Sequence, residues 1–69
     1  MKYTARYYGA PCAEDGEQGP ETSTPATLAR ETLHAGQRLD FFRLSDEAQT
    51  TPIRRWQAGA TGATYEVTL

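Results

Sequence analysis

Residues 24–44 decide the fold, and their sequence is TPATLARETLHAGQRLDFFRL. Thr24 is a favourable N-cap residue, and Pro25 suits the first position of a helix, where its missing N–H costs nothing. Gly36 stands where a left-handed C-cap residue belongs. Apolar and polar side chains fall on opposite sides at helical spacing, namely Leu28, Ala29, Thr32 and Leu33 against Thr27, Arg30, Glu31 and His34. We therefore predict a helix over residues 25–35.

The same stretch continues into a predicted strand at residues 37–44, where Leu39 and Phe41 alternate with polar side chains. Phe42 interrupts this alternation, because adjacent residues of a regular strand point to opposite faces of the sheet. Two arrangements remain open. Either a β-bulge intervenes, or one of the two phenylalanines lies on the face away from the helix.

Three further segments have strand patterns. Residues 2–8 and residues 64–69 alternate aromatic or apolar side chains with polar ones, as a half-buried strand does. Residues 52–58 form the third segment, although Ile53 and Trp56 are out of phase with each other. Trp56 therefore either faces outward, as a candidate interface residue, or belongs to the core of a bulged strand.

The order of these segments is strand, long loop, helix and then three strands, which predicts an α+β fold. Short connections join the last three strands, so we expect an antiparallel meander, with the first strand paired elsewhere on the same sheet. Residues 1–69 are expected to form a single small two-layer domain. In it, one helix packs on a three- or four-stranded, mainly antiparallel sheet, in the order β-α-β-β-β.

A long acidic loop is predicted at about residues 10–24. It is punctuated by glycine and proline and carries four acidic side chains but no basic one: Glu14, Asp15, Glu17 and Glu21. Loops longer than about 12–15 residues are uncommon in compact domains and are usually functional or disordered. We predict that this loop touches a partner; the alternative is that it is only a solvated connection.

The composition excludes several classes of protein. The chain has 69 residues, a net charge of −2, and one cysteine and one histidine, so an internal disulfide or a four-ligand zinc site cannot form. No run approaches the ~20 apolar residues of a membrane span, and the first residues do not resemble a signal peptide. We expect a cytoplasmic protein with no cofactor. A core of this size supplies only about 3–5 kcal/mol, so a homodimer is one way to stabilise it.

The reactive side chains do not indicate catalysis. Cys12 lies close to acidic residues, whereas a nucleophilic thiolate needs electropositive surroundings. His34 is expected in the last helical turn, where an imidazolium interacts favourably with the helix dipole. Adjacent carboxylates such as Glu14 and Asp15 should both stay solvated, whereas acid–base catalysis needs two different environments. We therefore predict a non-enzymatic protein with no catalytic and no metal-binding residues.

Arginine and aromatic residues are concentrated in the predicted strands. These residue types are enriched at the energetic centres of protein interfaces, and they also form platforms for single-stranded nucleic acids. Because acidic residues outnumber basic ones, a protein partner is preferred and nucleic acid is the alternative. The predicted partner-binding residues are Glu14, Asp15, Glu17, Glu21, Arg6, Tyr8, Arg54, Arg55 and Trp56.

In size and layout, the chain resembles the small accessory proteins of phages and mobile elements, which include anti-CRISPR proteins. This resemblance involves no particular residues. It implies an inhibitor of a host defence complex that acts by occluding a surface of a protein or nucleoprotein. The alternatives are a single-stranded nucleic-acid-binding accessory protein and a subunit that functions only as a homo-oligomer.

Overall fold

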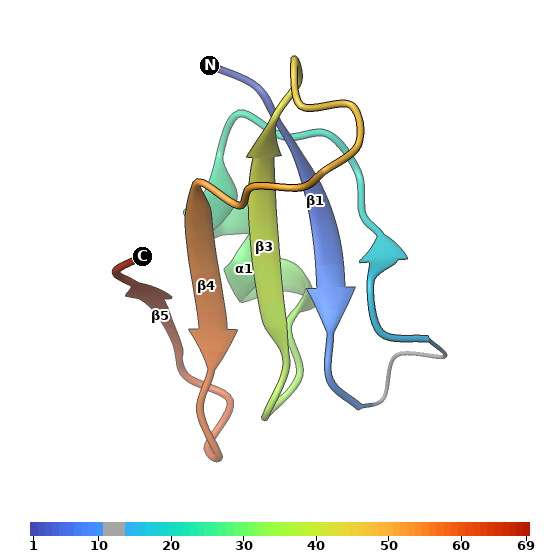
Figure 1. Ribbon diagram of the computed structural model, residues 1–69. Coiled ribbons are helices and arrows are strands. Elements are labelled where there is room, and N and C mark those ends of the chain that lie inside the picture. The colour runs from blue at the N-terminus through green and yellow to red at the C-terminus, as the bar shows by residue number, and fades with distance from the viewer. Residues whose placement is uncertain (11–13) are drawn as a thin grey trace.

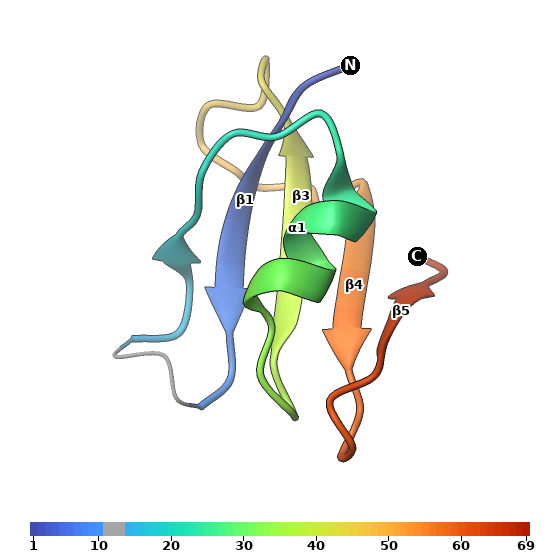
Figure 2. The same cartoon turned by 180° about the vertical axis from the view of Figure 1, so that it is seen from behind.

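Strand β3 (Arg38–Arg43) is the centre of the sheet in the computed structural model, which describes residues 1–10 and 14–69. Over these residues the sheet has five strands in the order β2-β1-β3-β4-β5, and all pairings are antiparallel. The other elements are β1 (Tyr3–Tyr8), β2 (Glu17–Gln18), helix α1 (Pro25–Thr32), β4 (Arg54–Ala58) and β5 (Thr64–Val67). Helix α1 covers one face of the sheet (Figures 1 and 2). The predicted two-layer α+β fold is therefore confirmed.

Strand β2 was not predicted, because the acidic loop shows no alternation of side chains. It is two residues long, and Glu17 lies opposite Tyr7 of β1. Backbone bonds hold the segment on either side: the Gly16 N–H donates to the Tyr7 carbonyl at 2.7 Å, and the Gly19 N–H donates to the Ala5 carbonyl at 2.8 Å. Part of the predicted loop is thus ordered by its peptide groups.

Helix α1 begins as predicted, with Thr24 as the N-cap and Pro25 in the first turn. The Thr24 side chain, however, makes no capping hydrogen bond. The hydroxyl of Thr22 accepts the Thr24 N–H at 3.0 Å instead, which fixes the chain as it enters the helix. The start of the helix therefore depends on Pro25 and on the turn before it.

The end of α1 corrects the prediction, because the helix stops at Thr32. Leu33 takes an extended backbone (φ −77°, ψ 130°), and its side chain packs against the core. The Gln37 N–H donates to the His34 carbonyl at 3.0 Å, closing a turn in which Gly36 has a φ of +83°. Gly36 thus supplies the left-handed residue of a type II turn rather than the helix C-cap.

The main core lies between α1 and the sheet. Its buried residues alternate along β1 and β3 as predicted, and the helix contributes Ala29. The Tyr3 ring meets the Phe41 ring edge-on, with 6.1 Å between the ring centroids. Ala5 and Leu39 complete this cluster, and both side chains are fully buried. The helix-facing sides of β1 and β3 are therefore those that the alternation indicated.

Strand β4 starts with an irregularity that explains its mixed sequence pattern. The Ile53 N–H donates to the Phe41 carbonyl at 2.8 Å, while Arg54 is the register partner of Phe41. Residues 53 and 54 both lie opposite Phe41, as in a β-bulge. The bulge shifts the phase, so Ile53 and Trp56 both pack against the main core. Of the two arrangements left open for Trp56, the core position is the one found.

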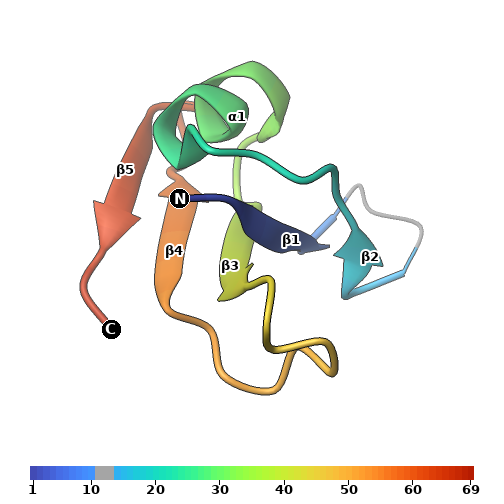
Figure 3. The ribbon, with the colours of Figure 1, turned by 90° about the horizontal axis from the view of Figure 1, so that it is seen from above.

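Phe42 is buried on the face away from α1, outside the main core. Its side chain is only 2 % exposed, and the register of β3 against β1 runs through it without interruption. The segment of residues 44–53, here called the crossing loop, runs over this face of β3 and β1 before it enters β4 (Figure 1). Seen from above, the crossing loop and α1 lie on opposite sides of the sheet (Figure 3). The central strand is thus covered on both faces.

Asp46 organises the crossing loop. Its carboxylate accepts the backbone N–H groups of Thr51 and Thr50, each at 3.0 Å, and the Thr50 hydroxyl at 3.2 Å. These hydrogen bonds, above all that from Thr51, lower the pKa of Asp46 below its ordinary value. Gln49 turns the loop with a φ of 54°, and its side-chain oxygen accepts a hydrogen bond from Arg6.

The burial of Phe42 is tested by Phe42→Ala. Removing a buried phenylalanine costs about 3–5 kcal/mol, which equals the whole stability expected of a core this small. The variant should therefore be largely unfolded at room temperature in a circular dichroism melt. Leu44→Ala is the control, because Leu44 is 44 % exposed in the same loop. If the two variants melted alike, Phe42 would not be a core residue.

The role of Asp46 is tested by its pH dependence. Because the folded-state pKa lies below the ordinary 3.8, Asp46 stabilises the fold above that pH, and the contribution is lost as the pH falls through the folded value. Asp46→Asn should lower the melting temperature at neutral pH, and the gap to the wild type should close below about pH 4. A gap that stayed constant during acidification would contradict this role.

Candidate protein-binding surface

The face of the sheet opposite α1, here called the open face, carries two rows of polar side chains. The first row is Arg6, Asp40 and Arg55, which are register partners across β1, β3 and β4. The second row, formed in the same way, is Tyr8, Arg38 and Gln57. The crossing loop runs over part of this face (Figure 1). Asp40 is buried in its row, whereas the other five side chains are partly exposed. Strand pairing therefore gathers three arginines, a tyrosine and an aspartate.

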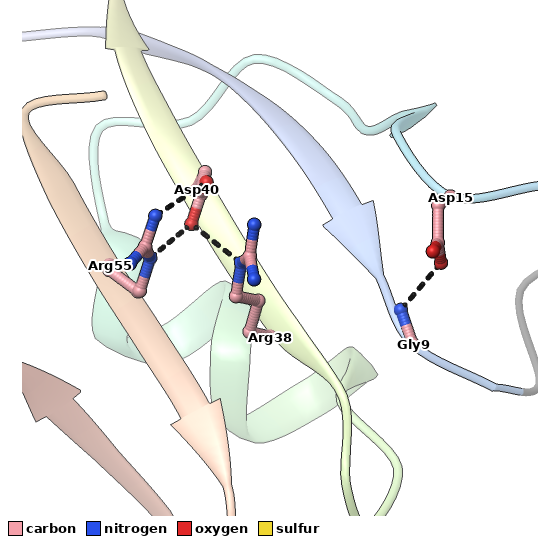
Figure 4. A network of polar contacts seen from close by, with 5 residues as sticks. All are labelled: Gly9, Asp15, Arg38, Asp40 and Arg55. Carbon is pink, nitrogen blue, oxygen red and sulfur yellow. Dashed lines mark hydrogen bonds and ion pairs between the residues drawn. The ribbon is translucent and has the colours of Figure 1, made fainter. Parts of the chain in front are cut away.

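Asp40 is a buried carboxylate in the middle of the open face, with 3 % exposure. Arg55 binds it with two hydrogen bonds, from Nε to Oδ1 at 2.7 Å and from Nη2 to Oδ2 at 3.1 Å (Figure 4). The Nε of Arg38 donates to the same Oδ1 at 3.3 Å. A buried carboxylate without such partners would be very costly. The pair also raises the pKa of Arg55, mainly through the hydrogen bond to Asp40.

Arg38 is held from a second side by Tyr8. The guanidinium carbon lies 4.3 Å from the centroid of the tyrosine ring, which is the geometry of a cation–π contact. The Arg38 side chain still keeps 39 % of its surface exposed. Arg38 is thus the guanidinium group of the open face that is both fixed in place and available to a partner.

Arg6 connects the open face to the acidic loop. Its Nη1 donates to the Gly16 carbonyl at 2.7 Å, and its Nε donates to the Gln49 side chain in the crossing loop. Two of its five N–H donors are therefore used within the protein. Of the predicted partner-binding residues, Arg6 now has a clear structural role as well.

The acidic residues of the loop do not form one group. Glu14 and Glu17 are exposed and line a hollow of about 370 Å³, together with Gly16 and Gln18. The Asp15 carboxylate accepts the Gly9 N–H at 2.9 Å and so connects the residue after β1 to the segment before β2 (Figure 4).

Glu21 is exposed at the other end of β1. Its neighbour Thr22 forms a bridge with Tyr3, whereas Glu17 pairs with Tyr7. The structure therefore brings Glu14 and Glu17 together beside the open face and separates Glu21 from them.

Arg54 and Trp56 lie on the helix-facing side of β4, not on the open face. Arg54 forms a bidentate ion pair with Glu66, at 2.8 and 3.1 Å, and lies 5.9 Å from the centroid of the Tyr3 ring. This pair lowers the pKa of Glu66, mainly through the hydrogen bond from Arg54. Trp56 packs against the core, and its buried Nε1 has no partner among the described residues. These two predicted residues are thus separated from Arg6, Tyr8 and Arg55.

Sequence reasoning missed Asp40 and placed Arg38 in a strand without assigning it to the site. The signal was an aspartate between two buried apolar residues, Leu39 and Phe41, in the middle of a strand. A carboxylate in a central strand requires cationic neighbours. Arg38, two residues earlier on the same face, was the nearest candidate in the sequence.

The structure describes one of the two reactive residues of the sequence, His34. His34 is exposed and follows the end of α1, so the expectation that it lies in the last helical turn was wrong. Cys12 lies outside the described residues. Among the residues that the structure does describe, no group of three His, Cys, Asp or Glu side chains could hold a metal ion. Within the described residues, no helix is long and apolar enough to span a membrane.

Comparisons of the chain with protein-family models, characterised proteins and solved structures found no match. The case for a function therefore rests on the chemistry of the open face.

The pairing of Asp40 is tested by a double-mutant cycle. Hydrogen bonds to charged groups contribute about 1.5–3 kcal/mol each, so Arg55→Met should lower the free energy of unfolding by at least that amount. The double variant D40N/R55M should lose less than the sum of the two single changes, because it leaves no buried charge unpaired. Urea denaturation measures all three variants. Additive losses would show that the two side chains are not coupled.

Proposed function

We propose that this protein is a non-enzymatic protein-binding module that contacts its partner with the open face of the sheet. The observation that carries this proposal is the arrangement around Asp40, which fixes Arg38 and Arg55 side by side at the surface. Fixed guanidinium groups bind carboxylates with little further loss of side-chain entropy. Arginine and tyrosine are also the residue types that dominate interface energies.

The mixed charge around the open face supports a protein partner. The arginine rows lie directly beside the acidic hollow, since the Gly16 that lines the hollow also accepts a hydrogen bond from Arg6. A nucleic-acid strand that crossed the arginines would meet the carboxylates of Glu14 and Glu17. A protein surface can offer acidic groups to the arginine rows and basic groups to the acidic hollow.

Single-stranded nucleic acid is the alternative partner, and it has less support. Base stacking needs an uncovered aromatic ring. The Tyr8 ring of the predicted platform carries the Arg38 guanidinium, and the exposed ring on this side of the sheet is that of Tyr65 at its edge. Two residues of the predicted platform, Arg54 and Trp56, lie on the other side of the sheet. Inhibition of a host defence complex is a narrower form of the proposal and stays a prediction.

The proposal is tested by Arg38→Glu, with Arg30→Glu as the matched control. Both reverse one positive charge, but Arg30 is exposed on α1, on the opposite side of the sheet. A partner captured with the wild-type protein is purified, and its affinity for each variant is measured by calorimetry. R38E should weaken binding about tenfold or more, as expected for a residue at the centre of an interface. R30E should bind as the wild type does.

Equal affinities for R38E and R30E would reject the open face as the contact surface. The nucleic-acid alternative is checked with fluorescently labelled single-stranded oligonucleotides at low and high salt. Binding that falls steeply with salt and is lost in R38E would replace the protein partner with a nucleic acid.

The contribution of the acidic hollow is tested separately with the double variant E14K/E17K. Neither side chain forms a hydrogen bond or ion pair within the described residues, so the melting temperature should stay within a few degrees of the wild type. Partner affinity should fall, because the charge of the hollow is reversed. Unchanged affinity would remove the hollow from the interface, whatever the result for Arg38.

A further inference from the structure

Strand β5 is an open edge of the sheet. It pairs with β4 on one side, and no strand of the described chain pairs with its other side (Figure 1). Proteins often protect such edges with proline or with unpaired charges. Residues 64–69 contain no proline, and their one charged side chain, Glu66, is already paired with Arg54 at 2.8 Å. The edge is therefore open to another strand.

The peptide groups of this edge can be assigned from its neighbours. Ala58 donates its N–H to Gln37, and Gly59 donates to Ala63. Because successive residues of a strand direct their peptide groups alternately to the two sides, Tyr65 and Val67 face β4. Within β5, the outer side then presents the N–H and carbonyl groups of Thr64 and Glu66. Those of Thr68, which follows the end of β5, would continue the row once pairing extended the strand.

Exposed apolar side chains gather at the same edge. The large hydrophobic residues with the most exposure in the described chain are Met1, Leu44, Tyr65 and Leu69. Tyr65 is 50 % exposed and Leu69 is 57 % exposed. Tyr65 and Val67 lie on the open-face side of the edge, opposite Gln57 and Arg55. Leu69 follows the end of β5 and would join them once pairing extended the strand by two residues. A strand that docks here would cover them.

We propose that two copies of this chain pair through β5 in antiparallel orientation, with Val67 of each copy at the two-fold axis. In this register, Tyr65 of one copy lies opposite Leu69 of the other, and Glu66 lies opposite Thr68. The outward peptide groups of Glu66 and Thr68 then bond to each other across the axis. Apolar pairs directly opposite one another stabilise a sheet. This interface does not depend on the function proposed for the open face.

Repulsion between like charges disfavours the register that is shifted by one residue. A two-fold axis at Glu66 would place two carboxylates directly opposite each other, and like charges in that position are destabilising. An axis at Val67 separates them. In the joined sheet the α1 helices of the two copies would lie on the same side.

The other edge of the sheet offers no comparable surface. Strand β2 is two residues long and contains Glu17, and Glu14 lies in the turn that precedes it. Two copies that met there would oppose their acidic residues. The second copy is therefore expected at β5.

The dimer is tested by sedimentation velocity over a range of protein concentrations. A contact of this size is at the weak end of protein interfaces, so the wild type should change from monomer to dimer in roughly the micromolar range or above. Val67→Lys and Val67→Glu should each weaken dimerisation at least tenfold, and an equimolar mixture of the two should restore it as a heterodimer. Leu44→Lys, an exposed apolar residue away from the edge, should dimerise as the wild type does.

A cysteine scan tests the register independently and does not need a charge in the strand. In a Cys12→Ser background, single cysteines are placed at positions 65, 66, 67 and 68 and oxidised mildly. Val67→Cys should cross-link fastest, because directly opposed residues near a two-fold axis have the spacing of a disulfide. A wild type that stays monomeric to about millimolar concentration overturns the proposal. So does fastest cross-linking at position 66, or loss of dimer in Leu44→Lys but not in Val67→Lys.

Discussion

The burial of one carboxylate in the central strand organises this protein. Asp40 is 3 % exposed, and a charge in such a position must be compensated. Arg55 supplies two hydrogen bonds from β4, and Arg38 supplies a third from β3 itself. The compensation fixes both guanidinium groups on the open face. A requirement of folding thus produces the surface on which the proposed function depends.

The same strand joins the fold to the candidate site. Leu39 and Phe41 anchor β3 beneath α1, while Phe42 is buried on the other face, over which the crossing loop runs. Arg6 ties that loop to the acidic turn through Gln49 and the Gly16 carbonyl. The arginines, the acidic hollow and the crossing loop are therefore all attached to a strand that is buried on both faces. A surface whose side chains are already held in place loses less entropy on binding, which supports the proposed recognition of a partner.

The sequence predicted those strands and that helix start whose own residues carry the pattern. The side-chain alternation of β1, β3 and β5 and the position of Pro25 placed the strands and the start of the helix. The end of α1 could not be predicted in this way, because Leu33 leaves the helix to reach a core formed by distant strands. Strand β2 depends on backbone pairing with β1, which leaves no pattern in the side chains.

The candidate site was only partly predictable for a related reason. The arginines were recognisable, but their assignment to one face or the other depends on the bulge at Ile53, which is a pairing of β4 with β3. That bulge places Arg54 and Trp56 beside the core and Arg55 on the open face. Asp40 was overlooked because alternation alone places a polar residue there on a solvated surface, whereas the structure buries it.

The central claim is that Asp40 holds Arg55 rigidly at the surface, and nuclear magnetic resonance of the arginine Nε–H groups tests it most directly. The Arg55 Nε–H, at 2.7 Å from Asp40, should exchange slowly with water, with Arg30 on the exposed face of α1 as the fast-exchanging reference. The signal should also show a scalar coupling across the hydrogen bond to the Asp40 carboxylate. An Arg55 signal that exchanges as fast as that of Arg30 would contradict the account.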